Sequence, residues 1–263
     1  MNRSSIIAFA GKGGVGKSTL AVLFLKYILE NREKKKIKDI LVIDADPDAN
    51  IGDLIGKEVR FEQTVGGKMS GLKRRISRRE IPPNMPKNSI IESEIFETLI
   101  EMDEFDLLEM GRSEGSGCYC SVNNVIKKVI DTLSKNYDLT LIDSPAGLEH
   151  FARKMDRDVE DLIIVTDPSK MGLHTIKRIV EVSREVELEF KNIYILGNRF
   201  SDNLKSVLEK EVNDIDQGNI KLLGLVPNDE KISEINITGQ SLLDISSENP
   251  AYLQAQELFN KII

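Results

Sequence analysis

Residues 10–19 read AGKGGVGKST, and this stretch decides the fold. It follows a short apolar run, residues 6–9, and precedes an apolar-periodic run, residues 20–29, which predicts strand, glycine-rich loop and helix. From Gly11 to Ser18 the residues match the pattern G-x-x-x-x-G-K-[ST]. Glycines let backbone N–H groups turn inward, and the helix start adds a positive dipole end, so the loop suits the phosphates of ATP or ADP. A plain glycine-rich turn before a helix is the simpler alternative.

The pattern gives the residues of this loop separate tasks. We expect Lys17 to reach the β- and γ-phosphates, Ser18 to ligate Mg²⁺, and Thr19 to add a phosphate contact. The predicted nucleotide-binding residues of the loop are Gly11, Gly13, Gly14, Val15, Gly16, Lys17, Ser18 and Thr19. Lys12 is a second cation directly after the first glycine. Two lysines would crowd the same phosphates unless Lys12 serves another site.

The bulk composition is that of one α/β domain spanning residues 1–263. Hydrophobic residues make up 40% and charged residues 30%, as in ordinary globular proteins. The net charge of −7 argues against a nucleic-acid or anionic-membrane partner. No apolar run is long enough to cross a bilayer, and the first residues predict a strand rather than a signal peptide. With two cysteines and therefore no disulfide framework, we expect a cytoplasmic protein.

Strand and helix signals alternate along the chain. The further apolar runs expected as strands are residues 40–43, 105–110, 139–143, 162–165, 193–196 and 222–226. Helical patterns such as residues 173–188 separate them, which predicts a mostly parallel sheet with helices on both faces. Ligands of such sheets bind at the carboxyl ends of the strands. The glycine-rich loop, Asp44 with Asp46, and Asp143 all fall at such ends.

The stretch from residue 57 to residue 101 is the least regular part of the sequence. It holds three prolines, several glycines and a basic cluster, which consists of Lys73, Arg74, Arg75, Arg78 and Arg79. We expect an insertion of loops and short helices on the nucleotide face. A solvated surface accounts for the basic cluster, and docking to an acidic protein is the alternative.

Three aspartates at strand ends are candidates for metal and water chemistry. Asp44 and Asp46 lie two residues apart, so an extended backbone points both to one face. Carboxylates there can hold Mg²⁺, position the second lysine or orient an attacking water. Asp143 ends its apolar run as the Mg²⁺-binding aspartate of a Walker B strand does. The structural alternatives are a helix N-cap for Asp46 and a simple turn for Asp143.

Residues after two later strands suit a base pocket. Asn198, followed by Arg199, comes after the run 193–196, and an asparagine amide can pair with the N6/N7 edge of adenine. Pro227, Asn228 and Asp229 follow the last predicted strand and match the other side of such a pocket. Asparagine and proline also occur at strand ends simply because they favour turns, and this is the structural alternative.

Cys118 and Cys120 form a C-x-C pair after two glycines. In an extended loop both thiols point the same way and supply half of a tetrahedral thiolate site. No other cysteine exists, and His150 and His174 are the only histidines. A two-fold homodimer would bring four sulfurs together, which suits Ni²⁺ or Zn²⁺. Buried packing of two small side chains is the alternative.

With Lys12 in place, the glycine-rich loop resembles that of the deviant Walker A family. This family contains MinD- and ParA-type ATPases, the nitrogenase iron protein and nickel-insertion ATPases. The resemblance implies an ATPase in which Lys12 reaches the partner's nucleotide across a homodimer interface. It also implies that Asp46 orients the attacking water, that Asp44 supports the metal and lysine shell, and that Asn198 contacts adenine. The implied catalytic residues are Lys12, Lys17, Asp44 and Asp46, with Mg²⁺ held by Ser18, Asp44 and Asp143.

Residues 111–124, GRSEGSGCYCSVNN, closely resemble the C-x-C region of CooC-type ATPases. Together with DADPDAN and a downstream AGLEH, the resemblance spans nearly the whole chain. It implies a homodimer that holds metal on Cys118 and Cys120 and assists nickel insertion into apo carbon monoxide dehydrogenase or a related nickel enzyme. One departure is the DSPAG stretch around Pro145, which resembles that of partition ATPases.

Two other functions remain open at this point. The first is an electron-transfer ATPase like the nitrogenase iron protein, although that family draws its cluster cysteines from two separate loops. The second is a positioning ATPase like MinD or ParA, although residues 251–263 show no basic amphipathic anchor.

Overall fold

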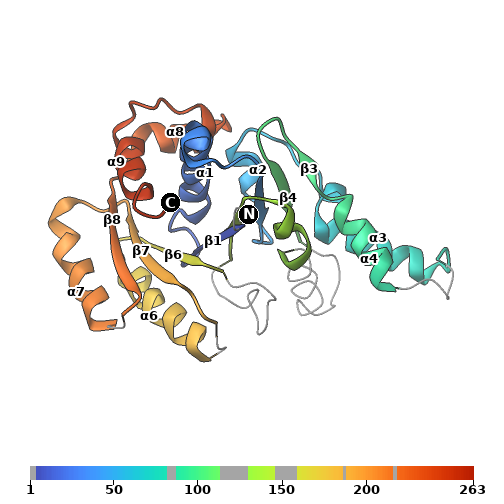
Figure 1. Ribbon diagram of the computed structural model, residues 1–263, viewed down its shortest axis with the longest axis horizontal. Helices are drawn as coiled ribbons and strands as arrows, with labels where there is room; N and C mark the ends of the chain where they lie inside the picture. Colours follow the sequence, from blue (N-terminus) through green and yellow to red (C-terminus); the bar gives the residue numbers. More distant parts are fainter. Residues whose placement is uncertain (1–3, 82–86, 113–129, 146–158, 186–187, 216–217) are drawn as a thin grey trace.

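The computed structural model describes residues 4–81, 87–112, 130–145, 159–185, 188–215 and 218–263. One eight-stranded sheet runs through the molecule in the order β3-β4-β2-β5-β1-β6-β7-β8 (Figure 1). The strands are β1 (Ser5–Ala10), β2 (Ile40–Asp44), β3 (Ile100–Glu101), β4 (Asp106–Glu109), β5 (Leu139–Asp143), β6 (Asp161–Thr166), β7 (Asn192–Asn198) and β8 (Ile220–Val226). All pairs are parallel except β3–β4. The predicted α/β fold is therefore confirmed.

Helices connect the strands and cover both faces of the sheet. The α-helices are α1 (Lys17–Lys35), α2 (Ile51–Leu54), α3 (Val65–Ser77), α4 (Lys87–Phe96), α6 (Lys170–Glu185), α7 (Lys205–Ile215), α8 (Glu230–Thr238) and α9 (Pro250–Phe259). Short 3₁₀ turns are η1 (Phe61–Gln63), η2 (Ser134–Asn136), η4 (Asp202–Leu204) and η5 (Leu242–Asp244). Within the described ranges, none of the helices has the length and apolar character needed to cross a bilayer.

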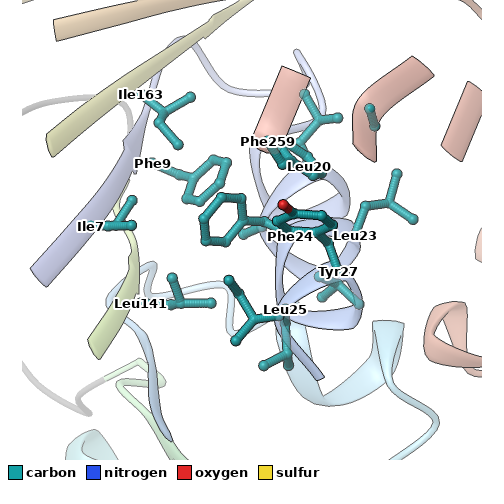
Figure 2. Close-up of a cluster of buried hydrophobic side chains, with 14 of the residues drawn as sticks. Ile7, Phe9, Leu20, Leu23, Phe24, Leu25, Tyr27, Leu141, Ile163 and Phe259 are labelled. Atoms are coloured by element: carbon teal, nitrogen blue, oxygen red, sulfur yellow. The ribbon is translucent and has the colours of Figure 1, made fainter. Parts of the chain in front are cut away.

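The central strand β1 is buried on both faces, as alternation along a strand requires. Ile7 and Phe9 point into the core beneath α1 and α9, whereas Ile6 and Ala8 point into the core that α6 and α7 cover. On the first face the ring centroids of Phe9 and Phe24 lie 5.7 Å apart (Figure 2). This packing fixes α1 against β1, and therefore fixes the loop that joins them.

The stretch from residue 57 to residue 101 contains a helical pair at one end of the molecule (Figure 1). Thr64 caps α3 by accepting a hydrogen bond from the Gly67 amide at 3.1 Å. An ion pair of 2.6 Å joins Arg75 of α3 to Glu94 of α4. Residues 73–80 at the end of α3 are all exposed, so the basic cluster lies on the surface.

The strand β8 forms one edge of the described sheet. A groove of about 800 Å³ runs beside it, between α7 and α9. There the Lys261 ammonium lies 3.5 Å from the backbone carbonyl of Leu223. This groove lies along the strand edge and includes no residue of the glycine-rich loop.

Candidate nucleotide site

The glycine-rich loop joins β1 to α1 in a conformation that two of its glycines require. Gly11 has φ +145°, and a Cβ there would lie 2.2 Å from the Val165 carbonyl oxygen. Gly16 has φ +92°, and a Cβ there would lie 2.3 Å from Asn198 Nδ2. Residues other than glycine rarely adopt such positive φ angles, and neither position has space for a Cβ atom. The loop thus sits tightly between the ends of β6 and β7.

The buried side chain of Lys17 indicates an anion-binding site more strongly than any other feature of the described residues. It occupies the first position of α1 and is only 6% exposed. Within the described residues, no hydrogen bond or ion pair satisfies its ammonium group. The nearby Asp143 carboxylate attracts this ammonium, and a phosphate at the start of the helix would supply it with a hydrogen-bonding anion. Lys12 is half-buried, and its ammonium likewise has no partner in these ranges.

Three buried carboxylates lie side by side at the carboxyl ends of adjacent strands. In the sheet register Asp44 of β2 stands opposite both Asp143 of β5 and Glu109 of β4. None of the three is more than 2% exposed. Carboxylates this close together and this deeply buried favour protonation. Among the described residues, no group of three or more His, Cys, Asp or Glu side chains is arranged to hold a metal ion.

The pKa values of all three carboxyl groups are raised. Burial, the Asp143 charge and the Glu109 charge put the pKa of Asp44 well above its usual range. Burial raises the pKa of Asp143 to about 6, although the Ser18 hydroxyl and the Lys17 ammonium oppose this shift. Burial also raises the pKa of Glu109 to about 7.

Asp143 fits a role as a Mg²⁺ ligand or as the acceptor for a Mg²⁺-bound water. Both of its oxygens are buried. The Ser18 hydroxyl lies near enough to lower the Asp143 pKa, but no donor among the described residues reaches hydrogen-bonding geometry. Oxygen is the ligand that Mg²⁺ prefers, and the ion keeps several waters. A divalent cation beside Ser18 would satisfy the two oxygens and relieve their repulsion with Asp44.

Asp44 and Asp46 have different surroundings despite their spacing. Asp44 accepts hydrogen bonds from the amides of Asp46 (3.0 Å) and Ile51 (2.8 Å), so both of its oxygens hold the backbone. Asp46 is partly exposed and accepts one bond, from the Asp48 amide at 3.0 Å. It does not cap α2, whose N-cap residue is Asn50. The Asp46 carboxylate therefore remains available to a ligand at the sheet edge.

The residues after β7 brace the glycine-rich loop. Asn198 is 8% exposed, and its Nδ2 donates a 2.8 Å hydrogen bond to the Val15 carbonyl oxygen. Arg199, at φ +59°, donates from its guanidinium to the Gly14 carbonyl oxygen. The predicted base-pocket residues of this strand are thus in contact with the phosphate-binding backbone.

The strand β8 pairs with β7, and its last residue, Val226, stands opposite Asn198. Pro227 and Asn228 are exposed. Asp229 caps α8 through the Ile232 amide at 2.9 Å, and its other oxygen accepts a hydrogen bond from Asn249 at 3.0 Å. Its carboxylate therefore has a structural task in addition to any contact with a base.

Glu109 is the site residue that the sequence did not reveal. It ends β4, as Asp143 ends β5, and lies inside the apolar run predicted at residues 105–110, so an acidic residue near the end of that run was the available signal. Cys118, Cys120 and His150 lie outside the described residues.

Comparison with known proteins decides the family. Residues 6–242 match the model of the CobQ/CobB/MinD/ParA nucleotide-binding domain. The chain belongs to this family. An uncharacterized ATP-binding protein of Methanocaldococcus jannaschii is 41% identical over 98% of both chains. The carbon monoxide dehydrogenase accessory protein CooC of Rhodospirillum rubrum is 30% identical over 91% of this chain and 90% of that protein.

Solved structures of the CobQ/CobB/MinD/ParA family share the fold. A ParA-family ATPase from Chlorobium tepidum has a TM-score of 0.68 at 18% identity, covering 98% of this chain and 99% of that one. The septum site-determining protein MinD of Pyrococcus horikoshii, solved with Mg-ADP, has a TM-score of 0.65 at 19% identity, covering 98% and 95%. The chain is accordingly an ATP-binding ATPase of the MinD/ParA type.

Proposed function

We propose that this ATPase dimerises around ATP and carries a thiophilic metal ion, Ni²⁺ or Zn²⁺, on the Cys118 and Cys120 pairs of two copies. The ion is its cargo, and the proposed recipient is apo carbon monoxide dehydrogenase or a related nickel enzyme. The similarity to CooC over most of both chains supports this choice.

The observation that carries the proposal is a pair of half-sites in one chain. The only two cysteines fall within one tripeptide and provide half of a tetrahedral thiolate set. Lys12 is a second loop lysine with no partner among the described residues. A two-fold dimer completes both, because each copy brings a thiol pair and a lysine to the other.

Each residue of the nucleotide site then has a task. Lys17 and the loop backbone hold the β- and γ-phosphates, Ser18 and Asp143 hold Mg²⁺, and Thr19 adds a phosphate contact. Lys12 contacts the partner's nucleotide, Asp46 orients the attacking water, and Asp44 supports the metal shell and the loop. The base lies between Asn198 with Arg199 and the Pro227–Asp229 turn. The MinD structure solved with Mg-ADP supports this choice of ligands.

Metal analysis of anaerobically purified protein tests the proposal. We expect about one Ni²⁺ or Zn²⁺ per two chains in wild type and none in the double variant C118S/C120S, with ATP affinity unchanged. Equal metal content in both proteins would end the proposal. Iron with a visible iron–sulfur absorbance would favour the electron-transfer alternative instead.

A positioning ATPase of the MinD or ParA type is the second candidate. The exposed basic residues at the end of α3 favour it, because such a surface attracts phosphate groups of lipids or DNA. Cosedimentation with anionic liposomes or duplex DNA in ATP tests it. ATP-dependent binding that K73E/R79E abolishes would support this function, and no binding at low salt would contradict it.

A further inference from the structure

The start of α2 is held by carboxylates from two different strands. The Ile51 amide donates to Asp44 of β2 at 2.8 Å, and the next amide, that of Gly52, donates to Glu109 of β4 at 2.7 Å. Two consecutive amides are therefore fixed to the carboxyl edge of the sheet.

Close packing at Gly52 makes this contact possible. A Cβ there would lie 2.6 Å from Glu109 Oε1 and 2.9 Å from the Lys57 carbonyl oxygen. Glu109 itself is 2% exposed, so its side chain has no freedom to leave the amide for solvent. Burial of a carboxylate is costly, and one backbone hydrogen bond is the contact that the structure shows for it.

The loop from residue 45 to residue 50 lies between these anchors and carries Asp46. At its start the Asp46 amide donates to Asp44, and within it the Ala49 amide donates to the Asp46 carbonyl oxygen at 3.0 Å. Ala49 has φ +47°, an unusual angle for alanine, so the turn is held by its surroundings.

The residues at and after the end of β4 hold the same loop from outside. The Met110 amide donates to the Asp44 carbonyl oxygen at 2.8 Å, and Arg112 forms an ion pair with Asp48. That ion pair is exposed on both sides and contributes little by itself. Glu109 is the buried carboxylate at the end of β4, and it holds the second residue of α2 through the Gly52 amide.

We propose that Glu109 is a positioning residue for ATP hydrolysis: by holding the Gly52 amide, it fixes the loop that carries Asp46 at the nucleotide. The inference rests on the proposed role of Asp46 in orienting the attacking water. Glu109 itself does not touch the nucleotide in this account. Its loss removes one of the two carboxylate anchors at that end of the loop and leaves only the contact between Ile51 and Asp44. A displacement of about 1 Å at a reacting group can cost 100-fold in rate.

Two variants of Glu109 separate positioning from simple packing. E109L fills similar volume without an acceptor, and we expect its kcat to fall about 10- to 100-fold while the Kd for ADP stays within about twofold. E109Q keeps an oxygen that accepts the Gly52 amide, so its kcat should stay within about threefold of wild type. Hydrogen exchange of the Gly52 amide should quicken in E109L and remain slow in E109Q.

A control and a double variant complete the test. Asp161, a carboxylate 7% exposed at the amino end of β6, accepts one side-chain hydrogen bond from Asn192 at 2.7 Å. D161L should lower the melting temperature without changing kcat. In D46A/E109L, kcat should be no lower than in D46A alone, because Glu109 acts through Asp46.

The outcomes distinguish this inference from the function on which it rests. If E109L hydrolyses ATP at the wild-type rate while D46A is inactive, Glu109 is not a positioning residue. Losses that multiply in the double variant overturn it as well, since they mean independent action. A D46A variant with wild-type kcat removes both the role of Asp46 and the role of Glu109. A Gly52 amide equally protected in E109L and wild type also contradicts the inference.

Discussion

Lys17 and Lys12 belong to one loop, but the structure buries only the first of them fully. The Lys17 side chain is buried, and its ammonium has no hydrogen-bond partner in the described ranges. A bound phosphate would therefore supply an acceptor to a cation that folding has already removed from water. We expect K17A to weaken ATP binding by about 100-fold or more, measured by calorimetry.

The matched control for K17A is K26A. Lys26 is another ammonium of α1, and it donates to the Leu243 carbonyl oxygen at 2.8 Å and pairs with Glu30. K26A should lower stability and leave the ATP affinity near that of wild type. Similar affinities for K17A and wild type would place the phosphates elsewhere.

Glycines of the same loop also differ in what they permit. G16A places a Cβ 2.3 Å from Asn198 Nδ2 at φ +92°, so we expect a loss of about 2 kcal/mol or more in stability and weaker nucleotide binding. Nothing lies within 4 Å of a Cβ at Gly13, and G13A should fold as wild type does. Urea unfolding of both variants checks this contrast, and equal losses would contradict it.

At the scale of elements, the sequence predicted seven of the eight strands and the helices between them. The strands β1, β2, β5 and β6 are apolar runs because both of their faces are buried, whereas β8 at the edge is only partly buried. The strand β3 escaped prediction because it has two residues, pairs antiparallel at an edge and shows no periodic pattern. The contact between Glu109 and Gly52 was not predicted either. It depends on which strands are neighbours in the sheet, and the hydrophobic pattern of a sequence does not give the strand order.

The start of β6 offers a test of charge burial away from the site. Burial raises the pKa of Asp161, and hydrogen bonding by Asn192 only partly opposes this shift. A raised carboxyl pKa means that folding favours the protonated form, so the stability penalty is absent at low pH and grows as pH rises through the folded pKa. D161N keeps the acceptor oxygen and removes the charge. Its stability gain over wild type, measured by urea unfolding, should therefore increase from pH 4 to pH 7.5.

An exposed carboxylate provides the opposite sign as a control. Hydrogen bonding and attraction by Lys68 lower the pKa of Glu97, so its small contribution to stability is present at neutral pH and lost on acidification. E97Q should therefore be slightly less stable than wild type at pH 7.5. A pH-independent gap between D161N and wild type would contradict the account of Asp161.

At the scale of the whole molecule, the proposed dimer has a direct readout. With a non-hydrolysable ATP analogue we expect light scattering to report twice the mass found with ADP. The K12A variant should remain monomeric with either nucleotide, because it lacks the lysine that contacts the partner's phosphates across the interface. A wild-type chain of constant mass with every nucleotide, or a K12A dimer of wild-type affinity, would contradict this prediction.

The sequence alone predicted that the glycine-rich loop, Asp44 and Asp143 lie at strand ends on one edge of the sheet, and the structure has them at the ends of the neighbouring strands β1, β2 and β5. It could not show that both carboxylate oxygens of Asp44 accept hydrogen bonds from backbone amides, because this depends on how the following loop turns. Nor could it show that Asn198 holds the glycine-rich loop, because this contact joins segments that are distant in the chain. The metal cargo stays a prediction from Cys118 and Cys120.

The position of β1 in the sheet has a consequence for biosynthesis. This strand pairs on one side with residues 139–143 and on the other with residues 161–164. Because both partners follow β1 in the sequence, β1 cannot complete its pairing until residue 164 has been synthesised. Until then β1 is an apolar strand with both edges unpaired, which is the kind of segment that associates with other chains.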